Sequence, residues 1–235
     1  MGWMPRSHLG SIEGMGILKR TRRSDYFLED LDPDNLPLFG LVEGGAQTEA
    51  NSLLPRVDET GGLLLQGSET VYGKWDATAR WMTRPRPDFK SELWARSPES
   101  SAVALTTARI VVMGRVSERI HLVGSMPLDS IWSVSCLQLD SGGGVVNFEA
   151  FHEQGDESIL VSIDNVGFAG ALNAARQATK FIVSQRLEAP PYQLSEADKA
   201  ALGAAAISSK ESNGDGATSW ELPGAVAIEQ AIRLL

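Results

Sequence analysis

The chain has 235 residues, 43% hydrophobic and 22% charged, which is enough apolar material for one folded core with extensions. Its 30 acidic and 21 basic side chains give a net charge of -9, which argues against a nucleic-acid partner, because nucleic-acid binders are basic overall or have a dominant basic face. The single cysteine excludes an internal disulfide, and no apolar run reaches the ~18 residues of a membrane-spanning helix. We therefore expect a cytoplasmic protein.

Residues 1–62 are predicted to form an N-terminal arm and linker. Residues 25–42 are rich in large apolar side chains and contain two prolines, so an extended segment is expected. Such a segment needs a surface to cover, either this chain's own core or a partner protein. Residues 43–62 are rich in Gly, Gln, Asn and Glu, a composition typical of linkers. The arm residues predicted to contact a partner are Phe27, Leu31 and Phe39.

The folded core is predicted over residues 63–187, and most of it has strand patterns. Apolar residues recur at every second position in several runs, and glycine-containing turns separate the last three. This pattern predicts an antiparallel meander. The predicted strands are Glu69–Thr83, Ser91–Arg96, Ser101–Thr106, Ala108–Arg115, Arg119–Val123, Ser130–Leu139, Val145–His152 and Glu157–Ile163.

A helix is predicted at the end of this core, over residues 167–187. Asp164 or Asn165 can cap it, and apolar side chains then recur with helical spacing on one face. Strands followed by one long amphipathic helix predict a mainly β domain in which the helix closes an open end of a barrel. The residues of the predicted buried face are Phe168, Leu172, Ala175, Thr179 and Ile182.

Residues 188–235 are predicted to form a C-terminal extension with a linker and short helices. Ser195 and Asp198 have the spacing of a capping box before an Ala-rich segment that reaches Ile207. A polar linker follows over residues 208–219. The last helix needs a surface, which is the core, a second copy of the chain or another protein. Its apolar face contains the predicted partner-binding residues Ile228, Ile232 and Leu235.

Residues with catalytic chemistry are few. Cys136 shares strand parity with Val134, which predicts a buried core thiol. The only histidines are His8, His121 and His152; we interpret the last two as strand residues with satisfied hydrogen bonds. None of them has metal-ligand spacing with another histidine or with the cysteine. We therefore predict no enzyme activity, no metal and no cofactor.

Two sequence phrases carry a family resemblance. The run Ala-Leu-Thr-Thr-Ala-Arg-Ile-Val-Val at 104–112 and the run Pro-Leu-Asp-Ser-Ile-Trp-Ser-Val at 127–134, with the helix at 167–187, resemble the GRAM and bacterial PH-like families. The resemblance covers about residues 65–187. It implies the pleckstrin-homology fold, a seven-stranded bent antiparallel barrel closed by a C-terminal helix. Members of these families bind lipid headgroups, proteins or peptides.

The resemblance also implies a candidate anion site. Pleckstrin-homology domains that bind phosphoinositides hold the phosphates with basic residues in the pattern Lys-x(n)-Lys/Arg-x-Arg. Acidic residues dilute the corresponding region here, and a solvated loop stiffened by two prolines is the other interpretation. Arginine would suit phosphate because its planar fork donates two parallel hydrogen bonds. The candidate headgroup-binding residues are Lys74, Arg80, Arg84, Arg86 and Lys90.

These observations support two hypotheses. The first is a non-enzymatic PH/GRAM-like interaction module that associates with another protein, or with itself, through its barrel and its flanking apolar segments. The alternative is a peripheral membrane module that binds anionic lipid headgroups at the basic loop, in which case vesicle binding would be salt-sensitive.

Overall fold

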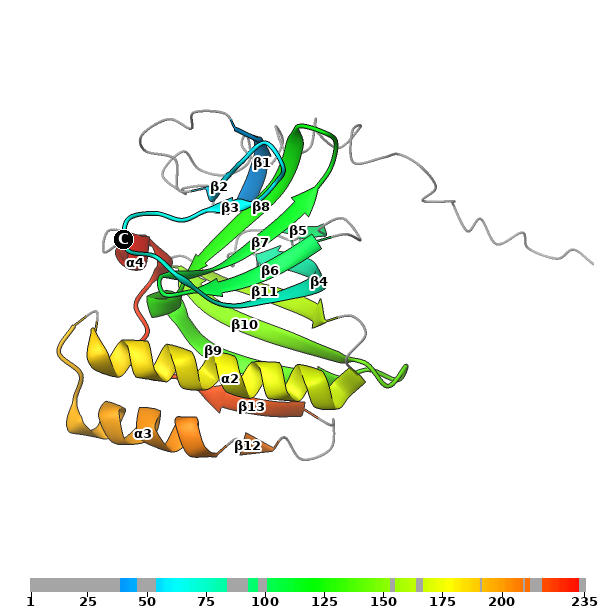
Figure 1. The fold of residues 1–235 in the computed structure, drawn as a ribbon. Coiled ribbons are helices and arrows are strands. Elements are labelled where there is room, and N and C mark those ends of the chain that lie inside the picture. The colour runs from blue at the N-terminus through cyan, green and yellow to red at the C-terminus, as the bar shows by residue number, and fades with distance from the viewer. Residues whose placement is uncertain are drawn as a thin grey trace, which may run out of the picture. The chain divides into compact units, whose positions relative to one another are not determined.

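The computed structural model describes residues 39–45, 54–83, 93–96, 101–152, 155–163, 167–190, 192–208, 210–211 and 217–232, all within the unit Leu36–Leu235. Eleven of the described strands form one bent antiparallel sheet (Figure 1). Along the sheet these strands are β1 (Phe39–Glu43), β8 (Ile120–Pro127), β7 (Arg109–Arg115), β6 (Ser101–Thr106), β4 (Val71–Thr83), β11 (Gly155–Ile163), β10 (Gly144–His152), β9 (Ile131–Gln138), β13 (Ala217–Glu221) and β12 (Lys210–Glu211), with β5 (Leu93–Arg96) on β4. Strands β2 (Arg56–Val57) and β3 (Leu63–Leu64) form a separate hairpin.

Strand β4 belongs to both halves of the sheet. Its residues up to Asp76 pair with β6, and its residues from Ala77 onward pair with β11. Ala77 and Ala79 are almost fully buried at this change of partner, and their small side chains let the two halves approach closely. The sheet therefore bends at β4, because this strand is long enough to pair with both halves and its inward side chains at the bend are small.

The sheet is open. The 3-10 turn η1 (Leu128–Ser130) joins β8 to β9, but these two strands do not pair. Instead β8 pairs with β1 and β9 pairs with β13. The predicted mainly β class with a packed helix is confirmed, whereas closure of the seven-stranded barrel is not confirmed in the described strands.

Helix α2 (Gly167–Glu188) lies along β9 and β10 (Figure 1). It approaches the sheet closely because its buried face is rich in alanine. At Gly144 of β10, an added Cβ would lie 2.5 Å from the Cβ of Ala171, so the strand needs a glycine there. Of the predicted helix face, Ala175, Thr179 and Ile182 are buried, and Phe168 and Leu172 pack against the core while partly exposed.

The C-terminal extension packs on the same unit. Helix α3 (Glu196–Ile207) packs against α2 and begins at the predicted capping box of Ser195 and Asp198. Strand β13 lies within and beyond the predicted linker and adds to the edge of β9, and helix α4 (Ile228–Ile232) follows it. At the other end, β1 and β2 precede residue 63, where the predicted central domain begins.

Arg186 of α2 connects the extension to the sheet. This buried side chain donates hydrogen bonds from Nη1 to the carbonyls of Leu222 (2.9 Å) and Pro223 (3.2 Å). Its Nη2 donates to the carbonyls of Leu128 and Ile131, both at 2.8 Å. Burial lowers the pKa of Arg186 to about 10, and the carboxylate of Asp129 opposes this effect. One guanidinium thus joins α2, the β8–β9 turn and the segment after β13.

Candidate interaction surface

Tyr72 and Phe181 form a stacked aromatic pair between β4 and α2. Their ring centroids lie 4.0 Å apart and the ring planes differ by 14°. The register of β4 against β6 shifts between Val71 and Gly73, and such a bulge redirects a side chain. Gly73 also avoids a tight contact, because an added Cβ would lie 3.2 Å from the indole of Trp75. Sequence reasoning missed this pair, although a glycine inside a predicted strand is a signal for a bulge.

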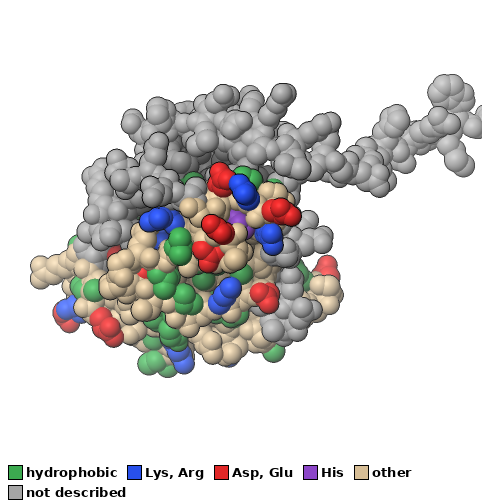
Figure 2. All heavy atoms as spheres, turned by 45° about the horizontal axis from the view of Figure 1, so that its top comes forward, with side chains coloured by type: hydrophobic (Ala, Val, Ile, Leu, Met, Phe, Trp, Pro, Cys, Tyr) green, Lys and Arg blue, Asp and Glu red, His purple; other side chains and the backbone are tan. Residues whose placement is uncertain are grey.

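Exposed hydrophobic side chains are concentrated in the sequence segment that contains Tyr72. Leu64 (38% exposed), Leu65 (42%), Val71 (47%) and Tyr72 (52%) all lie within nine residues of sequence. Phe181 is partly buried and packs against the core. Figure 2 shows hydrophobic side chains gathered in the middle of one face of the molecule. We call Leu64, Leu65, Val71, Tyr72 and Phe181 the apolar surface.

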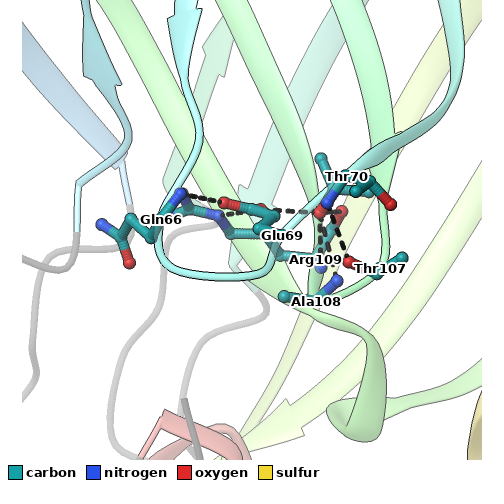
Figure 3. A network of polar contacts seen from close by, with 7 residues as sticks. Gln66, Glu69, Thr70, Thr107, Ala108 and Arg109 are labelled. Carbon is teal, nitrogen blue, oxygen red and sulfur yellow. Dashed lines mark hydrogen bonds and ion pairs between the residues drawn. The ribbon is translucent and has the colours of Figure 1, made fainter.

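A buried polar network holds the turn inside the apolar surface, between Leu65 and Val71 (Figure 3). The carboxylate of Glu69 accepts hydrogen bonds from Nε (2.9 Å) and Nη2 (3.0 Å) of Arg109, from the hydroxyl of Thr106 (2.7 Å) and from the amide of Gln66 (3.0 Å). Burial raises the pKa of Glu69, but these hydrogen bonds outweigh it and hold the pKa below the ordinary value of 4.5.

The same network extends along the Thr-Thr corner between β6 and β7. The amide of Thr107 donates to the carbonyl of Thr70 (2.9 Å), and the hydroxyl of Thr107 accepts from the amide of Thr70 (3.0 Å). The hydroxyl of Thr106 also accepts from the amide of Arg109 (3.0 Å). The family-like phrase at 104–112 is therefore a structural corner, and its side chains position the neighbouring turn.

The predicted headgroup-binding residues are only partly within the described chain. Lys74 is exposed on β4, two residues after Tyr72. Arg80 lies on the same strand, where its backbone is paired with Leu160 of β11 and Arg96 of β5. The remaining three, Arg84, Arg86 and Lys90, lie outside the described residues. Convergence of the five basic side chains stays a prediction.

The predicted partner-binding residues differ in their environments. Ile228 is fully buried in this chain's own core, which is one of the three surfaces considered for the last helix. The buried side chain is unavailable to a partner while α4 is docked. The backbones of Phe39 and Ile232 lie in β1 and α4 respectively. Phe27, Leu31 and Leu235 lie outside the described residues.

The described reactive side chains are buried. Cys136 lies in the core as predicted, and burial raises the pKa of its thiol to about 11. His121 lies in β8 as a strand residue, but its Nε2 has no hydrogen-bond partner, so the expectation of a satisfied histidine is wrong for that atom. Within the described ranges, no three His, Cys, Asp or Glu side chains are placed to hold a metal ion. No described helix has both the length and the apolar character to cross a membrane.

Comparisons with known proteins give similarity to solved structures but not to known sequences. No family model matches the sequence, and no curated protein matches it. Among solved structures, the N-terminal PH domain of Vps36 is similar to this chain, with 12% sequence identity and a TM-score of 0.40. The match covers 63% of this chain and 94% of that one.

Proposed function

We propose that this chain is a non-enzymatic interaction module of PH-like architecture, which associates with a protein through the apolar surface. The observation that supports this most is the concentration of exposed hydrophobic side chains. Four of the eight large exposed hydrophobic residues in the described part of the chain lie within residues 64–72. Single exposed hydrophobic residues are ordinary, whereas contiguous ones mark interaction sites.

The apolar surface is built rigidly, which favours binding. The Glu69 network fixes the turn between Leu65 and Val71, and the stack on Phe181 fixes Tyr72. Side chains that are ordered before association lose less entropy when a partner binds. Tyrosine and phenylalanine are also enriched at protein interfaces relative to the rest of the surface.

Exposed basic residues lie next to residues of the apolar surface, either along the chain or across a strand pair. Arg56 pairs with Leu64 across the β2–β3 hairpin, Lys74 follows Tyr72 on β4, and Lys180 precedes Phe181 on α2. All three are exposed. A partner with apolar anchors and acidic flanking residues would complement this arrangement, since complementary charges at the rim favour association and orientation. A second copy of this chain and a different protein are both compatible with this chemistry.

Peripheral membrane binding is the second candidate. It is favoured by the exposed Lys74 beside Tyr72, because basic and aromatic side chains together suit a bilayer interface. The net charge of -9 opposes it, since an anionic membrane surface repels the chain as a whole. On these charges we rank protein association first, in the cytoplasm.

A double substitution tests the proposal. Leu65→Ser with Val71→Ser removes two exposed side chains of the apolar surface, and Leu139→Ser with Ile207→Ser removes two exposed side chains elsewhere. Sedimentation velocity of the full chain measures self-association, affinity capture measures binding to other proteins, and flotation with phosphoinositide vesicles measures lipid binding. We expect the first variant alone to lose protein association. Association unchanged in that variant, or binding to vesicles only, would contradict the proposal.

A further inference from the structure

Residues 54–64, which we call the strap, cover the outer face of β6, β7 and β8. Val57 is buried there in a small apolar cluster, separate from the main core, that includes Val111 and Val123. The strap is a hairpin whose turn is held by Asp58: its Oδ1 accepts hydrogen bonds from the amides of Thr60 (2.7 Å) and Gly62 (2.9 Å). The remaining residues of the apolar cluster are Ala104 and Met113, with Val42, Leu54, Leu63 and Ala102 packed against it.

His121 lies beneath the strap. It sits in β8 between Val42 of β1 and Arg115 of β7, and its side chain is only 3% exposed. At Gly61 of the strap, an added Cβ would lie 2.6 Å from Cε1 of the imidazole. At Gly44, which follows β1, it would lie 3.1 Å from Nε2. Two glycines from separate segments therefore enclose the ring, and Nε2 has no hydrogen-bond partner.

The charged groups around His121 come from every element packed against it. Arg115 of β7 disfavours a second positive charge, and Asp58 of the strap favours one. Glu59 of the strap is exposed, and Glu43 of β1 is engaged with Arg119 at 4.0 Å. Burial is the largest effect on the pKa of His121 and lowers it from 6.5; Arg115 lowers it further and Asp58 opposes. The enclosed site thus favours the neutral imidazole.

We propose that His121 makes the strap a pH-sensitive cover, which opens when the imidazole is protonated and uncovers the apolar outer face of β6, β7 and β8. An imidazolium has two N–H donors that require partners, and the closed strap excludes water from Nε2. Opening residues 54–64 hydrates the ring and separates Gly61 from it. Leu64 belongs both to the strap and to the apolar surface. The inference rests on His121 and the turn of the strap, so it stands independently of the proposed function.

The sign and range of the effect follow from proton linkage. Well above pH 6.5 the ring is neutral whether the strap is open or closed, so protonation does not favour opening. Below pH 6.5 the open form binds a proton more readily, and the open-to-closed ratio rises by up to about tenfold per pH unit until the closed form is protonated too. The pKa of Asp58 lies below 3.8, because Thr60 and the Gly62 amide donate to it, so its turn persists through this range.

Hydrogen exchange and NMR on the full chain test the proposal. After correction for intrinsic rates, we expect amide protection in residues 56–64 to fall at least fivefold between pH 7.5 and 5.5, while β9 and β10 stay protected. In His121→Gln the fall should disappear, and in the control His152→Gln it should remain.

The strap of the His121→Gln variant could be open at every pH, so an NMR pH titration of the wild-type chain provides a second test. The His121 ring signal and the amide signals of Gly61 and Gly62 should then share one midpoint below 6.5. The proposal would be overturned if amide protection in the strap did not change with pH. It would also be overturned if the His121→Gln variant, with its strap closed at pH 7.5, lost the same protection at pH 5.5. Ring and strap signals with unrelated midpoints would overturn it as well.

Discussion

Glu69 and Arg109 form a buried two-point ion pair across 40 residues of sequence, with Nε to Oε1 at 2.9 Å and Nη2 to Oε2 at 3.0 Å. The pair joins the turn before β4 to the start of β7. Because that turn lies between Leu65 and Val71, a polar contact inside the molecule fixes the position of exposed apolar side chains. The Thr-Thr corner between β6 and β7, which lies in the phrase that resembles the PH-like families, therefore helps to hold the apolar surface in place.

Removing one partner of this pair should destabilise the fold strongly. In Arg109→Met the carboxylate of Glu69 would stay buried without its cation, and such losses cost about 3–5 kcal/mol. Urea denaturation should show this as a lower free energy of unfolding. Arg115→Met, at the exposed end of the same strand, is the control and should cost less than about 1 kcal/mol. Equal effects of the two substitutions would show that the buried pair has no special role.

The same carboxylate predicts a pH dependence. The pKa of Glu69 is lower in the folded chain than its ordinary value of 4.5, so its contribution is present above pH 4.5 and is lost as the pH falls through the folded pKa. Glu69→Gln removes this contribution at every pH. The difference in unfolding free energy between wild type and Glu69→Gln should therefore shrink below pH 4.5. A difference that grows on acidification would contradict the arrangement.

Arg186→Met should loosen the C-terminal extension. It removes the guanidinium donor from four backbone carbonyls, of which that of Leu128 keeps the amide of Ile131 as a donor. Each buried carbonyl left unsatisfied costs about 1–3 kcal/mol unless water reaches it. We expect faster hydrogen exchange in residues 217–232 and a lower melting temperature. Arg176→Met changes an exposed arginine on the same helix and should leave both unchanged. Unaltered exchange in the Arg186 variant would exclude the guanidinium as the connecting element.

Neighbouring glycines offer a matched test of helix packing. Gly144→Ala places a methyl group 2.5 Å from the Cβ of Ala171 and must push α2 away from β10, so a cost of about 1–3 kcal/mol is expected. At Gly143 the nearest contacts of an added Cβ are 3.6 Å, so Gly143→Ala should change stability little. Thermal unfolding compares the two. Similar melting temperatures for both variants would mean that the helix does not rest on Gly144.

Local pattern was sufficient for the strands and helices of the central region. The predicted strand Ser101–Thr106 has the observed bounds, and most others agree to within a few residues. The Ser195 capping box is confirmed because cap and acidic residue lie three positions apart in sequence. Such features depend on neighbours along the chain, so they can be predicted from the spacing of residues in the sequence.

Long-range pairing was not visible in the pattern. Strand β13 needs the edge of β9 as a partner, and nothing within residues 217–221 encodes that edge. Ile228 has the same helical spacing whether it meets this chain's core or another protein, and only the packing shows that it is buried. The stack of Tyr72 on Phe181 joins residues far apart in sequence through a bulge, so the apolar surface also escaped prediction.

A hydrogen-exchange footprint of the associated state tests the central claim most directly. The full chain is compared as a monomer and in its associated form, whether with a second copy or with a captured protein. We predict that association increases protection in residues 64–72 and around Phe181, and leaves residues near Leu139 and Ile207 unchanged. Increased protection elsewhere with none at residues 64–72 would contradict the claim that the apolar surface is the binding site.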